Sequence, residues 1–213
     1  MARPLRITLV RHGETTGQSS VRYYGATDLP LSPLGEAQMQ RAGAALAHER
    51  FDALLSSRLL RSRHGAALVA RRRLEPRSLA AFDEVDFGNW EGWTREEIAA
   101  RDPENYRRWQ EQAETFAYPG GEHRPAFHRR VAAGLGAVLA DPPGRNLLVV
   151  VHRGVIAVIL SELLHLTPGE RRGLEIDLGS IHVVARRASA WDAESLNRVD
   201  HLNAAAGGAE VPA

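Results

Sequence analysis

The stretch Ile7-Thr8-Leu9-Val10-Arg11-His12-Gly13 sets the expectation for the whole chain. Its aliphatic and β-branched run at residues 7–10 predicts a buried β-strand. The run stops at an arginine, a histidine and a glycine, and a glycine lets a ligand approach the main chain closely. Open α/β sheets bind ligands at the carboxyl ends of their strands. The tripeptide therefore marks a candidate site, although by itself it fits a solvated strand end about equally well.

The same pattern returns in the second half of the chain, at Leu147-Leu148-Val149-Val150-Val151 followed by His152-Arg153-Gly154. A continuous apolar run predicts a strand that is buried on both faces. Residues 155–164 are apolar on nearly every side, which is typical of a deeply packed helix. We therefore expect two core strands, each of which delivers a histidine to the same edge of a sheet.

Strands alternate with helices along the chain, which is the pattern of an α/β fold. Further strands are expected at residues 53–55 and 78–82, with a last edge strand at 181–185. Helices are expected at residues 33–48, 59–73, 126–139 and 155–164, with short ones after Thr94 and Asp102. We predict a three-layer α/β/α sandwich with a mostly parallel central sheet, formed as one domain over residues 1–202. The Gly/Ala-rich residues 203–213 are expected to be a disordered tail.

Aromatic residues are concentrated in one segment, because eight of the 13 aromatics in the chain lie between Phe82 and Tyr118. Such a segment can form a cap over a site. It can equally be a satellite hydrophobic cluster under a long connection, and we expect a mixture of the two.

The composition excludes several classes of function. The 213-residue chain has a net charge of +1, which gives no electrostatic case for binding nucleic acid or a membrane surface. It contains no cysteine, which excludes thiol catalysis, and no lysine, which excludes lysine chemistry. The first predicted strand begins within a few residues of Met1, and no apolar run reaches membrane-spanning length. We therefore expect a cytoplasmic protein without a signal peptide.

Two more candidate residues follow predicted strands. Arg61 falls in the first turn of the helix after residues 53–55, where free amide groups favour anions. Glu84 comes directly after residues 78–82. The carboxyl ends of neighbouring parallel strands meet at one edge of the sheet, so Arg61 and Glu84 should lie near Arg11, His12 and His152.

These five residues make a chemical set suited to phosphate esters. The forked donors of arginine match a phosphate dianion and the charge that develops during phosphoryl transfer. Nearby positive charge lowers the pKa of a histidine, and a neutral imidazole is a nucleophile toward phosphorus. A carboxyl group near the leaving oxygen can donate a proton and later take one from water.

An ordered set of motifs resembles the histidine phosphatase superfamily, phosphoglycerate mutase-like branch, over residues 6–156. Its motifs are Arg11-His12-Gly13-Glu14-Thr15, Tyr24-Gly25-x-Thr27-Asp28-x-Pro30-Leu31, Ser56-Ser57-x-x-x-Arg61, Glu84-x-x-Phe87-Gly88-x-Trp90-Glu91-Gly92, Pro119-Gly120-Gly121-Glu122 and Val151-His152-x-Gly154. The resemblance implies that His12 is the phosphorylated nucleophile and Glu84 the proton donor. It also implies that Arg11, Arg61 and His152 bind the phosphoryl group.

The loop at residues 16–31 is expected to complete the site, with Gln18 donating to the phosphate and Arg22, Tyr24 and Gly25 contacting substrate. The chain departs from the family at Gln18, where Asn is common. Further departures are His64-Gly65 after Arg61, His123 in place of a frequent Ser, and Arg153 in place of a usual Gly. The segments Tyr24–Asp28, Phe87–Gly92 and Asp102-Pro103-Glu104 resemble those of α-ribazole phosphatases of cobalamin synthesis.

The resulting hypothesis is a metal-independent phosphomonoester hydrolase that works through a phosphohistidine on a small phosphorylated metabolite, with α-ribazole 5′-phosphate as a candidate. A metal held by His12, His152 and Glu84 is chemically conceivable, but the flanking arginines would repel a divalent cation, so no cofactor is expected. The alternatives are phosphoglycerate mutase-type transfer and a non-catalytic phosphate-binding module. A homodimer is left open.

Overall fold

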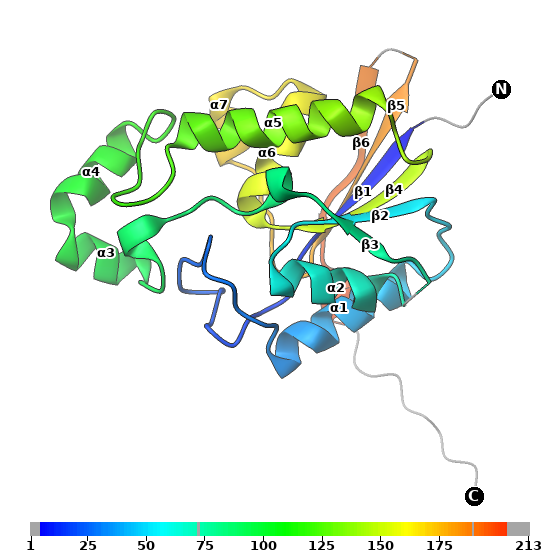
Figure 1. Cartoon of the computed structure of the whole chain (residues 1–213), viewed down its shortest axis with the longest axis horizontal. Helices are drawn as coiled ribbons and strands as arrows, with labels where there is room; N and C mark the ends of the chain where they lie inside the picture. The colour runs from blue at the N-terminus through cyan, green and yellow to red at the C-terminus, as the bar shows by residue number, and fades with distance from the viewer. Residues whose placement is uncertain (1–4, 72, 189, 204–213) are drawn as a thin grey trace, which may run out of the picture.

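A six-stranded sheet in the order β3-β2-β4-β1-β5-β6 forms the centre of the computed structural model, which describes residues 5–71, 73–188 and 190–203. Helices cover both of its faces (Figure 1). The neighbouring strands β1 (Arg6–Arg11), β4 (Asn146–Val151), β2 (Ala53–Ser56) and β3 (Pro76–Ser78) pair in parallel. The predicted α/β fold with a mostly parallel sheet is confirmed.

The other edge of the sheet differs from the prediction. β5 (Ile181–Arg187) runs antiparallel to β1, and β6 (Ala190–Arg198) runs antiparallel to β5 and forms the edge. The expectation that residues 181–185 form an edge strand is therefore wrong. β6 was not predicted because its residues are mostly polar and at least partly exposed, so the strand contains no apolar run.

The alternation of side chains along the central strands builds two hydrophobic cores. Leu147, Val149 and Val151 pack into one core, whereas Leu148 and Val150 pack into the other. The first core lies under α5 (Arg124–Ala140) and α6 (Arg153–Leu164), and the second under α1 (Pro33–Ala45) and α2 (Leu60–Val69). Figure 1 shows these two helix pairs on opposite sides of the sheet. A strand buried on both faces explains the unbroken apolar run in β4.

Helix ends follow local sequence signals. Ser32 caps α1, since its Oγ accepts a hydrogen bond of 3.1 Å from Gly35 N, and proline opens the helix. Two short helices not expected from the sequence are α7 (Pro168–Arg172) and α8 (Asp200–Asn203). Asn203 thus ends a helix, and the rest of the predicted tail lies outside the described residues. Among the residues described, no helix combines the length and the apolar character needed to cross a membrane.

The strand expected at residues 78–82 is also corrected. β3 ends at Ser78, and Ala80–Phe82 form a single 3₁₀ turn, η1. The carbonyl groups of Ala80 and Ala81 accept hydrogen bonds from the side chain of Arg130 on α5 rather than from a neighbouring strand. Glu84 therefore lies in the irregular segment after η1 and does not directly follow a strand.

The aromatic segment is a cap that packs onto the first core. It contains η2 (Gly88–Trp90), α3 (Arg95–Arg101) and α4 (Pro103–Glu111), which lie to one side of the sheet in Figure 1. Trp90 is fully buried and stacks on Phe116 with ring centroids 5.4 Å apart. The Trp90 indole donates a 2.9 Å hydrogen bond to Asp102 Oδ2. Trp90 and Phe116 belong to the same buried cluster as Leu147 and Val149 of the sheet, so the aromatics are part of the main core and the expected satellite cluster is wrong.

Replacing Gly13 with alanine is expected to destabilise the fold. A Cβ at Gly13 would lie 2.4 Å from Gly35 O and 2.7 Å from Gly35 Cα, and neither backbone atom can move away cheaply. We expect the unfolding free energy, measured by urea denaturation, to fall by about 2–3 kcal/mol. Gly136→Ala is the matched control, because no atom lies within 4 Å of its Cβ and alanine favours a helix by about 1 kcal/mol. Equal stability of the two variants would contradict this packing.

Candidate active site

His12 ends β1 in a fixed ring orientation. Its backbone N–H donates to Val151 O at 2.9 Å, which continues the pairing of β1 with β4. Its ring Nδ1 lies 2.7 Å from Gly13 O, and a carbonyl oxygen can only accept. The hydrogen bond therefore assigns the proton to Nδ1 and leaves a lone pair on Nε2. The side chain is buried, with an exposed fraction of 4%.

His152 stands beside His12 because β1 and β4 are paired in register, with Arg11 opposite Val151. The two imidazole rings meet edge to face, with centroids 5.1 Å apart. His152 also serves as the N-cap residue of α6. Its Nε2 lies 2.7 Å from Ser57 Oγ, which joins this histidine to the end of β2.

Both histidines are held in the neutral form. Burial is the main cause that lowers the pKa of His12 well below its ordinary value of 6.5, followed by the charges of Arg61 and Arg11. Burial and the charge of Arg61 likewise lower the pKa of His152. Near neutral pH the site therefore presents two uncharged imidazoles among arginines.

Arg61 is fully buried in the first turn of α2. Its guanidinium donates to Gly25 O at 2.6 Å, Thr27 O at 2.8 Å and Tyr24 O at 3.3 Å. These bonds hold the loop at residues 24–27 against the site. Burial lowers the pKa of Arg61, while nearby carboxylates, Glu84 first among them, oppose this shift.

Arg11 is the last residue of β1 and donates a 2.8 Å hydrogen bond to Ile176 O. Burial, and next the charge of Arg153, lower its pKa to about 10. Buried polar atoms are normally hydrogen-bonded, yet Arg11 Nε, Arg61 Nε and His152 Nδ1 have no partner among the described residues. Three residues of the predicted set thus each carry a buried nitrogen without a hydrogen-bond partner in the described part of the chain.

Glu84 lies on the irregular segment after η1 and packs against the start of α6. Glu84 is buried, with 7% of the residue exposed. Its carboxylate accepts hydrogen bonds of 2.9 Å from Val85 N and from Gly154 N. Gly154 is the second residue of α6, and a Cβ there would stand 2.4 Å from Glu84 Oε1. The glycine after Arg153 therefore allows the carboxylate to lie directly against the helix that follows His152.

The other predicted site residues lie on the loop after β1, with varied roles. Gln18 is exposed and adopts a positive φ of 65°. Arg22 donates to Gly92 O at 2.6 Å and to Glu97 Oε2 at 2.8 Å, so it ties the loop to the cap. Tyr24 and Gly25 meet Arg61 through their backbone carbonyls.

No role was predicted for Glu91, whose carboxylate organises the same loop. Its carboxylate accepts hydrogen bonds of 3.0–3.3 Å from the backbone amides of Gly25, Ala26 and Thr27, and one of 3.0 Å from Phe87 N. One side chain thus joins the loop at residues 24–27 to the segment that follows Glu84. The only signal was its place in the Trp90-Glu91-Gly92 motif.

An α/β protein that gathers neutral histidines, arginines and one carboxylate at the carboxyl edge of its sheet has the equipment of a phosphoryl-transfer enzyme. Within the described ranges, no three His, Cys, Asp or Glu residues form a group that could hold a metal ion. The chain belongs to the histidine phosphatase superfamily, branch 1, whose family model matches residues 7–199. The resemblance drawn from the motifs is confirmed.

Its relatives include phosphatases named for different substrates. The adenosylcobalamin/α-ribazole phosphatase of Salmonella typhimurium is 35% identical over 161 residues, covering 75% of this chain and 80% of that protein. Phosphoserine phosphatase 1 of Hydrogenobacter thermophilus is 32% identical over 149 residues, covering 70% and 71%. The crystal structure of the α-ribazole phosphatase from Shigella flexneri matches with a TM-score of 0.83 at 28% identity, covering 91% and 96%. An enzyme of the phosphatase type is thereby confirmed.

The buried histidines predict a loss of stability in mild acid. Below pH 6.5, His12 and His152 take up protons in the unfolded chain but stay neutral in the folded chain. The unfolding free energy therefore falls as the pH decreases. Each histidine contributes up to about 1.4 kcal/mol per pH unit. Urea denaturation between about pH 5 and 6.5 should show this dependence of the unfolding free energy on pH. In His12→Asn the dependence should correspond to about one fewer proton taken up on unfolding.

His48→Asn provides the control for this experiment. His48 is exposed in the folded chain, as it is in the unfolded one, so its removal is expected to leave the slope unchanged. The assignment of a buried neutral His12 is wrong if both variants keep the slope of the unsubstituted protein.

Proposed function

We propose that this chain hydrolyses small phosphomonoesters in two steps, with His12 as the nucleophile. The hydrogen bond from His12 Nδ1 to Gly13 O carries the proposal, because it leaves the Nε2 lone pair free to attack. The low pKa of His12 keeps that lone pair unprotonated. Arg11, Arg61 and His152 would bind the oxygens of the phosphoryl group, where the unpaired nitrogens are found.

In the first step, His12 Nε2 forms a bond to phosphorus while the bond from phosphorus to the ester oxygen breaks. Glu84, entering this step as a carboxylic acid, gives its proton to the leaving alkoxide. In the second step, a water molecule attacks phosphorus, Glu84 takes the proton of that water, and the N–P bond breaks. Inorganic phosphate leaves and His12 regains its lone pair.

The loop at residues 24–27 and the cap are placed to contact the alcohol part of the ester. Arg61 and Glu91 hold the main chain of this loop from both sides, so Tyr24 and Gly25 have defined positions next to the phosphate site. α-Ribazole 5′-phosphate is the first substrate to test, because relatives in Salmonella and Shigella carry that name. A cytoplasmic location and a homodimer stay predictions from the sequence.

His12→Asn is expected to lower kcat by at least about 10³-fold, since asparagine cannot form the phosphorylated intermediate. The unsubstituted protein should yield an acid-labile phosphoenzyme when a reaction with labelled phosphomonoester is quenched rapidly in alkali. Glu84→Gln should still form this phosphoenzyme from p-nitrophenyl phosphate, because that leaving group needs little protonation. Retained turnover in His12→Asn, or the lack of any phosphoenzyme, would refute the proposed nucleophile.

A substrate panel separates hydrolysis from phosphoryl transfer within one molecule. We expect release of inorganic phosphate from α-ribazole 5′-phosphate, phosphoserine and 3-phosphoglycerate in measurable and unequal amounts. With 3-phosphoglycerate, a mutase would form 2-phosphoglycerate faster than phosphate, which phosphorus NMR distinguishes directly. A protein that binds phosphate but turns over none of these esters would be a phosphate-binding module instead.

A further inference from the structure

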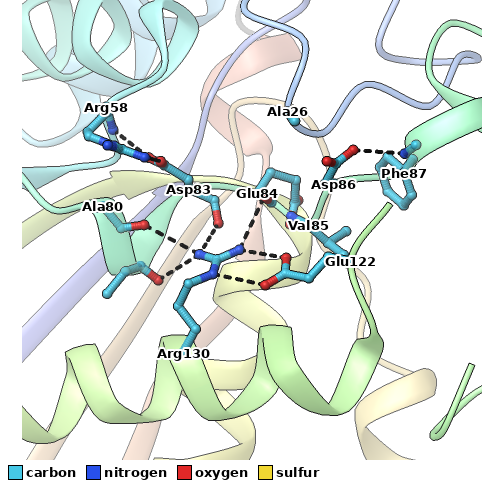
Figure 2. Close-up of polar contacts among 12 residues, drawn as sticks. Ala26, Arg58, Ala80, Asp83, Glu84, Val85, Asp86, Phe87, Glu122 and Arg130 are labelled. Carbon is cyan, nitrogen blue, oxygen red and sulfur yellow. Dashed lines mark hydrogen bonds and ion pairs between the residues drawn. The ribbon is translucent and has the colours of Figure 1, made fainter. Parts of the chain in front are cut away.

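Arg130, on α5, contacts the main chain of the segment that carries Glu84. Figure 2 shows its guanidinium between that segment and the carboxylate of Glu122. The carboxylate takes two of the donors, at 3.1 Å from Nε and 2.8 Å from Nη2. The remaining donors reach four backbone carbonyls, those of Asp83 at 2.9 Å, Ala81 at 3.2 Å, Ala80 at 3.4 Å and Glu84 at 3.4 Å.

These contacts supply hydrogen-bond partners for backbone groups in and next to the irregular segment that carries Glu84. Residues 83–87 belong to no strand or helix, so their backbone groups have no regular partners and their conformation depends on other contacts. Arg58 holds the other side of Asp83 through three donors at 2.6–2.8 Å, but its own side chain is 66% exposed. The pair formed by Arg130 and Glu122 is less exposed, at 29% and 21%, and lies directly at Glu84.

Only an arginine can make this set of contacts. The guanidinium is planar and presents five donors in a fixed fork, whereas lysine offers a single ammonium group on a flexible stem. Glu122 sets the plane of the fork by its two-point contact. Glu122 N also donates to Asp86 O at 2.9 Å, so the carboxylate partner is itself attached to the Glu84 segment.

We propose that Arg130, oriented by Glu122, is a positioning residue that places the Glu84 carboxyl group for proton transfer to the leaving oxygen. The proposal rests on the two-step hydrolysis proposed above. Arg130 acts through Glu84 and the main chain before it. Its loss should therefore impair the one chemical event that depends on the place of Glu84, namely protonation of the leaving group.

Leaving groups of different basicity test this proposal. An alkoxide leaves only when it receives a proton, whereas p-nitrophenolate is stable without one. We expect Arg130→Met to lower kcat/KM for glycerol 1-phosphate by about 100-fold and for p-nitrophenyl phosphate by less than about 5-fold. Arg130→Lys should show the same selectivity in weaker form. Arg129→Met, on the exposed neighbouring position of α5, is the matched control and should change neither value.

A double-substitution cycle identifies Glu84 as the group through which Arg130 acts. Glu84→Gln should show the same dependence on leaving group, and Glu84→Gln/Arg130→Met should be no slower on glycerol 1-phosphate than Glu84→Gln alone. Losses that multiply in the double variant would overturn the proposal. So would equal losses on both substrates in Arg130→Met, or unchanged kcat/KM for glycerol 1-phosphate.

Two further readouts separate this proposal from folding and from the proposed function. If Arg130→Met does not fold by circular dichroism, Arg130→Lys and Glu122→Gln decide by the same substrate ratio, and equal losses there overturn the proposal. Phosphoenzyme formed by Arg130→Met from p-nitrophenyl phosphate shows that the His12 chemistry stands, whatever the ratio. The absence of phosphoenzyme in the unsubstituted protein would instead refute the proposed function.

Discussion

The parallel, in-register pairing of β1 with β4 is the constraint on which the site depends. It sets Arg11 opposite Val151, so the next residue of each strand is a histidine and the two rings touch. A slip of one residue would reverse the faces of a strand that is buried on both sides, and the two hydrophobic cores prevent this. Stability of the core and geometry of the site therefore come from the same pairing.

Around these strands, the site is held together by charged side chains that bind main-chain groups. Arg61 binds carbonyls of the loop at residues 24–27, Glu91 binds amides of the same loop, and Arg130 binds carbonyls before Glu84. Irregular segments cannot satisfy their own backbone groups, and buried or half-buried ions do so with strong, directional hydrogen bonds. Segments remote in the sequence are thereby fixed next to the histidines without regular secondary structure.

The contrast between regular core strands and irregular segments held by charged side chains explains what could be predicted from the sequence. His12 and His152 were predicted as site residues because each follows the apolar run of a core strand, and the motif set placed Arg61 and Glu84 in the same family pattern. β6 was missed because an exposed edge strand needs few apolar residues. The contacts of Glu91 and Arg130 were invisible for another reason: their partners are backbone groups up to 66 residues away, and a backbone group leaves no mark in a sequence.

The hydrogen bond between His12 Nδ1 and Gly13 O also determines regiochemistry. A backbone carbonyl occupies one end of the imidazole permanently, so every electrophile that enters the site meets only the nitrogen remote from Cβ. Any covalent adduct of His12, whether with phosphorus or with an alkylating inhibitor, is then the tele isomer. The main-chain carbonyl of Gly13 determines which isomer forms, whichever ester is bound.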